Sequence, residues 1–104
     1  MELSIVICTY NRSSFLREGL EAIVQQRLAF LDVSIEIIVV DNNSCDETSS
    51  VVEEFKNKFS SLSLVYFLEK KQGISFSRNT AIQNSKGKFI AFVDDDAVVN
   101  ANWL

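Results

Sequence analysis

The amino-acid sequence predicts an α/β fold in which a mostly parallel sheet lies between two helical layers, a Rossmann-like three-layer α/β/α arrangement. Short apolar runs alternate along the chain with longer stretches whose apolar residues recur at helical spacing. These runs are apolar almost throughout, which is typical of parallel strands buried on both faces. With right-handed crossovers, the expected strand order is 3-2-1-4, half of a doubly wound sheet. The first two helices would then cover one face and the third helix the other.

The first half of the chain supplies two strands and two helices of this pattern. The first strand is expected over residues 3–8 and the second over residues 35–40. Ser13 or Ser14 can cap the first helix, whose apolar residues are Leu16, Leu20, Ile23, Val24 and Leu28. Ser44 is followed three positions later by Glu47, which is a capping-box pattern. We therefore expect Ser44 to cap a second helix, with the apolar face Val51, Val52, Phe55 and Phe59.

The second half supplies the remaining elements. A third strand is expected over residues 62–68, a third helix from about Ser75 to Ser85, and a fourth strand over residues 88–93. The whole chain, residues 1–104, is the usual size of one domain. The fourth strand would lie at an edge of the sheet, and its residues 89–93 carry no charge, bulge or proline to discourage pairing. Self-association through residues 88–93 is therefore expected.

Composition excludes several classes of function. The formal net charge is -4, which argues against a nucleic-acid partner because no basic field attracts phosphates. Histidine is absent, which removes Ser-His-Asp and Cys-His triads and the common zinc sites. The two cysteines, Cys8 and Cys45, form no disulfide framework and are expected to be free thiols.

The sequence shows no signal for a membrane-spanning or secreted chain. No apolar run approaches the roughly 20 residues that a spanning helix needs. The first residues, MELS, lack the basic start of a signal peptide. A cytoplasmic location is therefore expected.

Polar clusters follow three of the four expected strands. They are residues 8–12 after the first strand, residues 41–44 after the second and residues 94–96 after the fourth. In parallel sheets of this kind, ligands bind beyond the carboxyl ends of the strands, near the point where the strand order reverses. We therefore expect the three clusters to meet at one edge of the sheet.

The cluster after the fourth strand is acidic. Asp94, Asp95 and Asp96 follow directly on an apolar run, so their like charges repel one another and burial would add to the cost. A hard divalent cation relieves this repulsion, and carboxylate oxygens suit Mg²⁺ or Mn²⁺. The alternative is an acidic turn exposed to solvent.

The other polar residues each have two interpretations. The loop after the first strand is either a plain connection or a source of backbone N–H groups, the Tyr10 ring and the Arg12 cation for a nucleotide diphosphate. Asp41 and Asn42 are either ordinary turn formers or acceptors for a base or a ribose hydroxyl, as in dinucleotide folds. Arg78 is either a solvated charge on the third helix or a second cation near the phosphates.

Four motifs together resemble those of family 2 glycosyltransferases of the GT-A fold, and they occur in the order and spacing of that family. They are residues 7–12 (ICTYNR), residues 40–44 with Asp46 (VDNNS and D), residues 73–74 with 77–79 (GI and SRN), and residues 92–97 (FVDDDA). The pair Trp103 and Leu104 also matches the family pattern. The resemblance covers essentially the whole chain.

The resemblance implies an enzyme that transfers a sugar from a UDP-, GDP- or TDP-linked donor to a glycan or lipid-linked acceptor. This chain would be its N-terminal, nucleotide-sugar-binding half. In the family, the loop that carries Thr9 and Tyr10, and here also Asn11 and Arg12, contacts the nucleotide.

The remaining family contacts fall on the second and fourth strand ends. The position of Asp41 and Asn42 contacts the base. The D-x-D motif, here Asp94 to Asp96, contacts the ribose and the metal bound to the diphosphate, so Asp96 is the expected metal ligand with Asp94 and Asp95 in support. The metal would neutralise charge on the departing nucleoside diphosphate.

The sequence departs from the family pattern in two places. Asn42 stands where many members carry a second acid, although an amide can still pair with a base edge. The family's general base lies beyond the acidic motif, so we expect it beyond Leu104. In the complete enzyme, the location could be peripheral to the inner face of the membrane.

Two other classes of protein share some of these features. A phospho-acceptor receiver domain has similar size and an acidic Mg²⁺ pocket, but it would place paired acids after the first strand. A nucleotidyltransferase would need a glycine-rich phosphate loop there, and no glycine occurs before Gly19.

Overall fold

The computed structural model describes residues 3–27, 34–59 and 63–94 of the chain. Four strands and three helices alternate along it, within a residue or two of the expected boundaries. They are β1 (Leu3–Thr9), α1 (Ser13–Arg27), β2 (Ile35–Asp41), α2 (Thr48–Lys58), β3 (Ser63–Leu68), α3 (Ile74–Asn84) and β4 (Phe89–Asp94). Leu28 and Leu62, which were expected to belong to the first helix and the third strand, lie outside the described residues.

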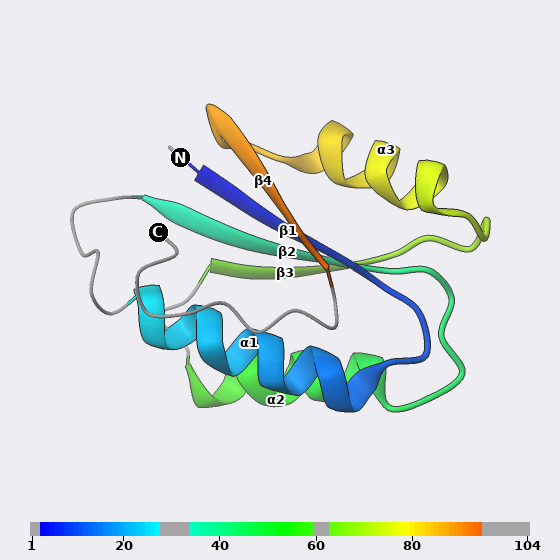
Figure 1. The fold of residues 1–104 in the computed structure, drawn as a ribbon, viewed down its shortest axis with the longest axis horizontal. Coiled ribbons are helices and arrows are strands. Elements are labelled where there is room, and N and C mark those ends of the chain that lie inside the picture. The colour runs from blue at the N-terminus through cyan, green and yellow to red at the C-terminus, as the bar shows by residue number, and fades with distance from the viewer. Residues whose placement is uncertain (1–2, 28–33, 60–62, 95–104) are drawn as a thin grey trace.

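The four strands form one parallel sheet in the order β3-β2-β1-β4, which confirms the expected order. In register, Leu3 of β1 lies opposite Ile35 of β2 and Phe89 of β4. Helices α1 and α2 cover one face of the sheet and α3 covers the other, as Figure 1 shows. The sequence produces this three-layer arrangement because its strands are apolar on both faces, so each face needs a helical cover.

Alternate residues of each strand serve the two helical layers. Toward α1 and α2, residues such as Ile5, Ile37 and Val39 pack with Leu20 and Phe55 in the larger core cluster. Toward α3, the smaller cluster contains Val6, Ile38, Val40 and Ala81. The core between the sheet and α3 therefore contains fewer buried apolar residues than the core on the other face.

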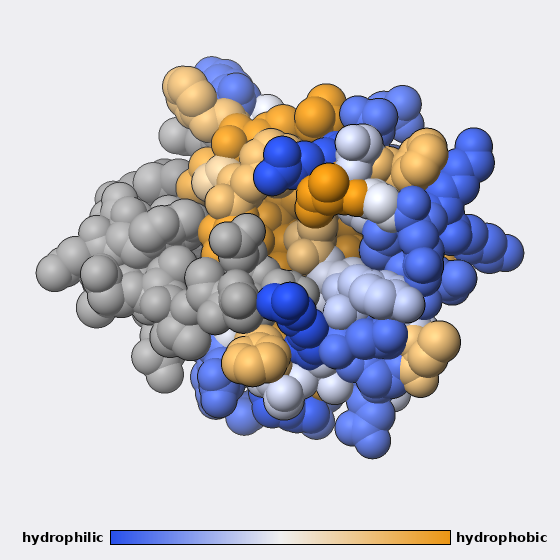
Figure 2. Space-filling view, turned by 45° about the vertical axis from the view of Figure 1, so that its right-hand side comes forward, coloured by the Kyte–Doolittle hydropathy of each residue, from blue (hydrophilic) through white to orange (hydrophobic). Residues whose placement is uncertain are grey.

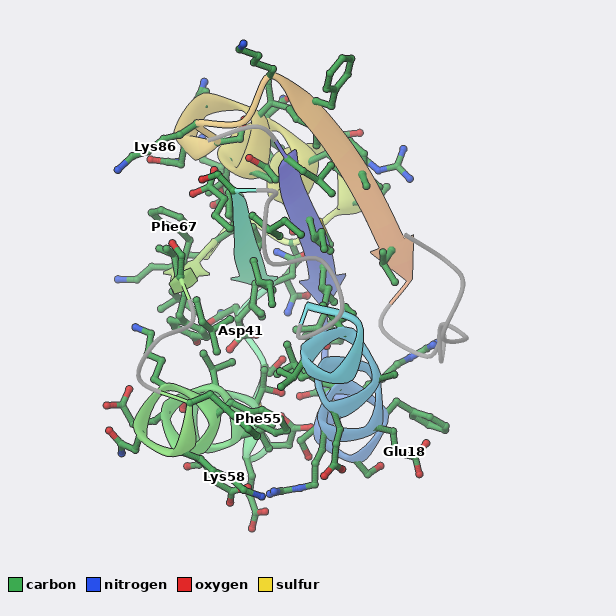
Figure 3. The ribbon with its side chains drawn as sticks, turned by 90° about the vertical axis from the view of Figure 1, so that its left-hand side faces the viewer. Glu18, Asp41, Phe55, Lys58, Phe67 and Lys86 are labelled. Atoms are coloured by element: carbon green, nitrogen blue, oxygen red, sulfur yellow. The ribbon has the colours of Figure 1, made fainter. Side chains whose placement is uncertain are left out.

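A buried carboxylate interrupts the apolar run of β2. Glu36 is 3% exposed, and its Oε2 atom accepts hydrogen bonds from the Ser4 hydroxyl at 2.6 Å and the Lys86 N–H at 2.6 Å. Ser4 Oγ in turn accepts the Gly87 N–H at 2.9 Å. We call these four residues the Glu36 network. It ties the connection before β4 to the amino ends of β1 and β2, at the opposite end of β2 from Asp41 (Figure 3).

The expected capping role of Ser44 is wrong. Helix α2 begins at Thr48, and its N-cap residue, Glu47, makes no side-chain capping hydrogen bond. Asp46 instead accepts the Thr48 N–H at 3.0 Å through Oδ1. The Ser44 hydroxyl is engaged elsewhere, because its oxygen accepts the N–H of Asn11 from a neighbouring loop.

Two further expectations can be compared with the described residues. Cys8 and Cys45 form no disulfide, as expected. No helix in residues 3–27, 34–59 or 63–94 is both long enough and apolar enough to cross a membrane.

Candidate functional site at the carboxyl edge of the sheet

Three loops lie together beyond the carboxyl ends of the strands. They are residues 10–12 between β1 and α1, residues 42–47 between β2 and α2, and residues 69–73 between β3 and α3. All three run along the right-hand side of the fold in Figure 1. The expectation that the polar clusters after the first and second strands meet at one edge is therefore confirmed.

The first two loops are joined by reciprocal hydrogen bonds. The Asn11 N–H donates to Ser44 Oγ at 2.8 Å, and the Cys45 N–H donates to Asn11 Oδ1 at 2.7 Å. Asn11 has a φ of 51°, a left-handed conformation that asparagine tolerates better than most residues. Asn11 was expected to contact substrate, and in this structure its side-chain oxygen holds the neighbouring loop.

Asp46 links the starts of two helices. Its Oδ2 atom accepts the Ser13 N–H at the start of α1, at 3.1 Å, and its Oδ1 atom accepts the Thr48 N–H at the start of α2. Burial acts to raise the pKa of this carboxyl, but the hydrogen bonds from Thr48 and Ser13 together outweigh burial and lower the pKa below its usual value. A negative charge at two helix N-termini also suits both helix dipoles.

Asp41 is buried at the end of β2, on the side of α1 and α2 (Figure 3). Its Oδ1 atom accepts the Ser44 N–H at 2.9 Å, and its Oδ2 atom accepts the Tyr66 hydroxyl at 2.5 Å. Burial, and then the hydrogen bond and the charge of Asp41, raise the pKa of Tyr66 well above its usual range. The carboxylate therefore fixes the β2–α2 loop and β3 while it remains ionised.

Asn42 joins the second loop to the third. Its side chain makes three hydrogen bonds to the backbone of Glu69, Lys71 and Gly73. The backbone of β2 contributes another, because the Glu69 N–H donates to Asp41 O at 2.8 Å. Loops 42–47 and 69–73 are thereby held side by side.

Glu69 connects the third loop to α3. Its carboxylate accepts the Thr80 hydroxyl at 2.6 Å and the Lys71 N–H at 3.0 Å. These two hydrogen bonds, with Thr80 the larger contribution, lower the pKa of Glu69. The loop and the first turns of α3 are consequently one connected unit.

The remaining candidate residues differ in exposure. Thr9 is buried and lies opposite Asp41 in register, whereas the Tyr10 ring is 45% exposed and Arg12 is exposed. Arg78 is exposed, and its guanidinium carbon lies 5.4 Å from the centroid of the Phe92 ring on β4. Arg78 thus lies against the strand that leads into the acidic run, and it is not grouped with the first two loops.

Strand β4 ends at Asp94, which lies opposite Cys8 of β1 in register. This places the start of the acidic run at the carboxyl edge, between α3 and the β1–α1 loop. The Asp94 side chain and all of Asp95 and Asp96 lie outside what the structure describes. Within the residues that are described, no three acidic or sulfur side chains gather as a metal site.

Sequence reasoning missed four residues that organise this edge: Ser44 as a loop connector, Asp46, Tyr66 and Glu69. For Asp46 a local signal existed, because an Asp two residues before a helix-starting Thr is a typical capping arrangement. Tyr66 bonds Asp41, 25 positions away, and Glu69 bonds Thr80 on the following helix, 11 positions away, and no local pattern indicates those contacts.

Comparison with known proteins identifies the family. The family model for glycosyl transferase family 2 matches residues 4–104. The chain belongs to glycosyl transferase family 2. This result decides against the receiver-domain and nucleotidyltransferase alternatives, and it agrees with a loop after β1 that contains neither paired acids nor glycine.

Curated relatives of this family 2 chain include two named sugar transferases. The chain is 32% identical over 104 residues to the poly(ribitol-phosphate) beta-N-acetylglucosaminyltransferase TarS of Staphylococcus aureus, covering all of this chain and 18% of TarS. It is 36% identical over 97 residues to the GalNAc(5)-diNAcBac-PP-undecaprenol beta-1,3-glucosyltransferase of Campylobacter jejuni, covering 91% of this chain and 29% of that enzyme. The chain therefore spans less than a third of the length of these relatives.

Solved structures of family 2 enzymes share the fold. The S. aureus TarS fragment 1–349 in complex with UDP superimposes with a TM-score of 0.82 and 31% identity, covering 97% of this chain and 29% of the fragment. The mannosyltransferase PcManGT of Pyrobaculum calidifontis, in complex with GDP-Man and Mn²⁺, gives a TM-score of 0.83 and 28% identity, covering 93% of this chain and 28% of the enzyme. The expected GT-A fold is confirmed.

Proposed function

We propose that residues 1–104 form the nucleotide-sugar-binding half of a glycosyltransferase that transfers a sugar from a nucleoside-diphosphate donor to a glycan or lipid-linked acceptor. The observation that carries the proposal is the carboxyl edge of the sheet. Three cross-linked loops and the start of an acidic run meet there, in a family 2 chain whose structural neighbours hold UDP or GDP-Man.

In this proposal exposed groups contact the donor together with two buried residues at the strand ends. The Tyr10 ring is exposed enough to lie against a base or ribose, and Arg12 and Arg78 supply cations for the diphosphate. Thr9 and Asp41 would contact the nucleotide from the strand ends, where they lie opposite each other.

We also propose that Mg²⁺ or Mn²⁺ binds with the donor. The donor set fits, because Asp94, Asp95 and Asp96 offer hard oxygen ligands and β4 delivers Asp94 to the carboxyl edge. Asp96 and Asp94 would hold the metal, and Asp95 would support the ribose. A bound metal would stabilise the negative charge of the nucleoside diphosphate as it leaves.

For the acceptor and the location of the complete protein we propose only a general class. The name of the C. jejuni relative describes an undecaprenol-linked acceptor, which supports a lipid-linked or polymeric acceptor for the complete protein. A cytoplasmic protein that works at the inner face of the membrane would meet both such an acceptor and a soluble nucleotide sugar.

The direct test is calorimetric titration of the chain with UDP, GDP and TDP, each with and without Mn²⁺. We expect one of them to bind in a Mn²⁺-dependent manner. Asp96→Asn should weaken that binding by well over tenfold, at least about 1.4 kcal/mol, because it removes a charged metal ligand. The control is Glu53→Gln, which makes the same change of charge on exposed α2. Equal affinity in wild type and Asp96→Asn would contradict the assignment of Asp96.

We further propose that the isolated chain pairs with a second copy through β4. No described strand pairs with the outer edge of β4, and Phe89 and Phe92 of this strand are 72% and 44% exposed. Figure 2 shows apolar surface gathered near the centre of one face. Burying one phenylalanine is worth about 1.5–3 kcal/mol. Association must also offset the loss of translational and rotational freedom, so the two rings and the strand-edge hydrogen bonds would have to act together.

Sedimentation velocity across a concentration series would test this pairing. Phe89→Lys should weaken association by at least about tenfold, because a lysine on an edge strand opposes pairing and the buried ring is lost. The matched control is Ile82→Lys, which changes another exposed apolar residue, on α3 and away from the strand edge. A wild-type chain that stays monomeric at every concentration would overturn the proposal.

A further inference from the structure

We propose that Asn42 is a positioning residue that holds the loop of residues 69–73, and with it the start of α3, in the place that nucleotide binding requires. It does so with both of its amide hydrogens, so it offers a base no hydrogen-bond donor. The inference rests on the proposed nucleotide-binding function and changes the role of a residue that the sequence assigned to base contact.

The hydrogen bonds of the Asn42 amide carry this inference. Asn42 is 9% exposed, and its Nδ2 atom donates to Glu69 O at 3.1 Å and to Lys71 O at 2.8 Å. Its Oδ1 atom accepts the Gly73 N–H at 2.8 Å. A primary amide has two N–H donors, so both are already used by the protein. No hydrogen of Asn42 remains to recognise a base.

The same geometry explains why an amide stands at this position. Two backbone carbonyl oxygens face the nitrogen, and a carboxylate would offer them no hydrogen and would repel them. An aspartate could keep only the bond from Gly73. The departure from the second acid of the family pattern is therefore a structural requirement of the 69–73 loop in this chain.

The held loop leads directly to a candidate binding residue. Gly73 has a φ of 138°, a conformation that favours glycine, and it immediately precedes Ile74, the first residue of α3. Glu69 bonds the Thr80 hydroxyl on the same helix. Arg78 lies between these two anchors, so displacement of the loop would displace its guanidinium group.

Calorimetry with UDP and GDP, each with Mn²⁺, separates positioning from base recognition. Asn42→Asp should weaken both nucleotides by the same factor of about ten or more, because a smaller fraction of the protein holds the binding-competent loop. The ratio of the two affinities should stay at its wild-type value. The matched control is Asn57→Asp, which makes the same chemical change at an exposed position of α2 away from this edge and should bind as wild type does.

A pH profile gives a second measurement that a merely steric role would not move. Protonation of the new carboxyl in Asn42→Asp restores one O–H donor, so its denaturant midpoint should approach that of wild type as the pH falls from 7 to 4. We expect the difference in denaturant midpoint between wild type and Asn42→Asp to fall by about half, because one of the two lost hydrogen-bond donors returns. Asp41, Tyr66, Glu69 and Lys71 are the ionisable groups nearby, so the profile is also recorded for Asn42→Ala, which removes the same donors and adds no carboxyl. Only the profile of Asn42→Asp should approach that of wild type at low pH.

The outcomes are distinct. If wild type binds no nucleotide, the proposed function fails and the inference falls with it. If wild type binds but Asn42→Asp matches Asn57→Asp, or the UDP-to-GDP ratio changes, the inference alone is overturned. Should Asn42→Asp fail to fold at pH 7, Asn42→Ala removes the same donors without adding charge, and it must leave the ratio unchanged.

Discussion

Gly87→Ala is expected to destabilise the fold strongly, although it adds only one methyl group. A Cβ atom at position 87 would lie 2.6 Å from the backbone nitrogen of Ser4, 2.6 Å from its Oγ atom and 2.8 Å from the carbonyl carbon of Leu3. Two of these atoms belong to the backbone of the central strand β1, so they cannot move aside. We expect the free energy of unfolding to fall by about 3 kcal/mol. This is near the upper end of the usual cost of adding a group to a tightly packed position.

Denaturant unfolding would measure this loss, with Lys88→Ala as the control. Lys88 is the exposed residue next along the chain, and its truncation should change stability by no more than about 0.5 kcal/mol. Gly87 belongs to the Glu36 network, which sets where β4 begins, so the folded fraction of Gly87→Ala should also bind nucleotide and Mn²⁺ more weakly. Coinciding unfolding curves for the two variants would show that the α3–β4 connection has room to move.

Asp41→Ala is expected to reduce both stability and nucleotide binding. The substitution leaves the Tyr66 hydroxyl and the Ser44 N–H without their charged acceptor, which costs about 2–3 kcal/mol of unfolding free energy. It also removes a carboxylate that we propose faces the nucleotide, so the affinity of the protein that remains folded should fall by more than tenfold. Denaturant unfolding and calorimetry at pH 7 measure the two effects separately.

Tyr66→Phe is the matched control, because it removes one of the two hydrogen bonds and keeps the carboxylate. It should cost less stability than Asp41→Ala and should leave most of the nucleotide affinity. In a Tyr10→Phe background Tyr66 is the one remaining tyrosine, and Asp41→Ala should lower its pKa toward the usual value in a spectroscopic titration. If Tyr66→Phe weakens nucleotide binding as much as Asp41→Ala does, the Asp41 carboxylate acts on the nucleotide only through the position of β3.

The strand order and the helical layers were predictable because they depend on patterns within short segments. Val39 and Val40 lie in an unbroken apolar run, which indicates a strand covered on both faces, and right-handed crossovers then leave few topologies. Glu36 shows the limit of such reasoning. Its burial depends on Ser4 and Lys86, which lie 32 and 50 positions away in the sequence.

The sequence was enough to predict which loops form the candidate site. It was not enough to predict what each side chain does there. The sequence indicated that Asn11, Asp41 and Asn42 belong to one edge, and the structure brings them there. Each side chain, however, is engaged by neighbouring loops. The prediction that Ser44 caps α2 was wrong for the same reason. Its hydroxyl matches a local motif, but its oxygen accepts the N–H of Asn11, 33 positions away. The distance between loops, which decides these contacts, is a property of the folded sheet.

The position of β1 between β2 and β4 also affects how the chain can fold during synthesis. Gly87 is synthesised 83 residues after Ser4. The edge of β1 that pairs with β4 therefore stays unpaired until then. At a translation rate of about 5–20 residues per second, this delay is roughly 4–17 s. During that interval one edge of the largely apolar strand β1 stays unpaired, and closing so long a loop is intrinsically slow. Until β4 has emerged, this open edge is the part of the nascent sheet most exposed to wrong strand pairing.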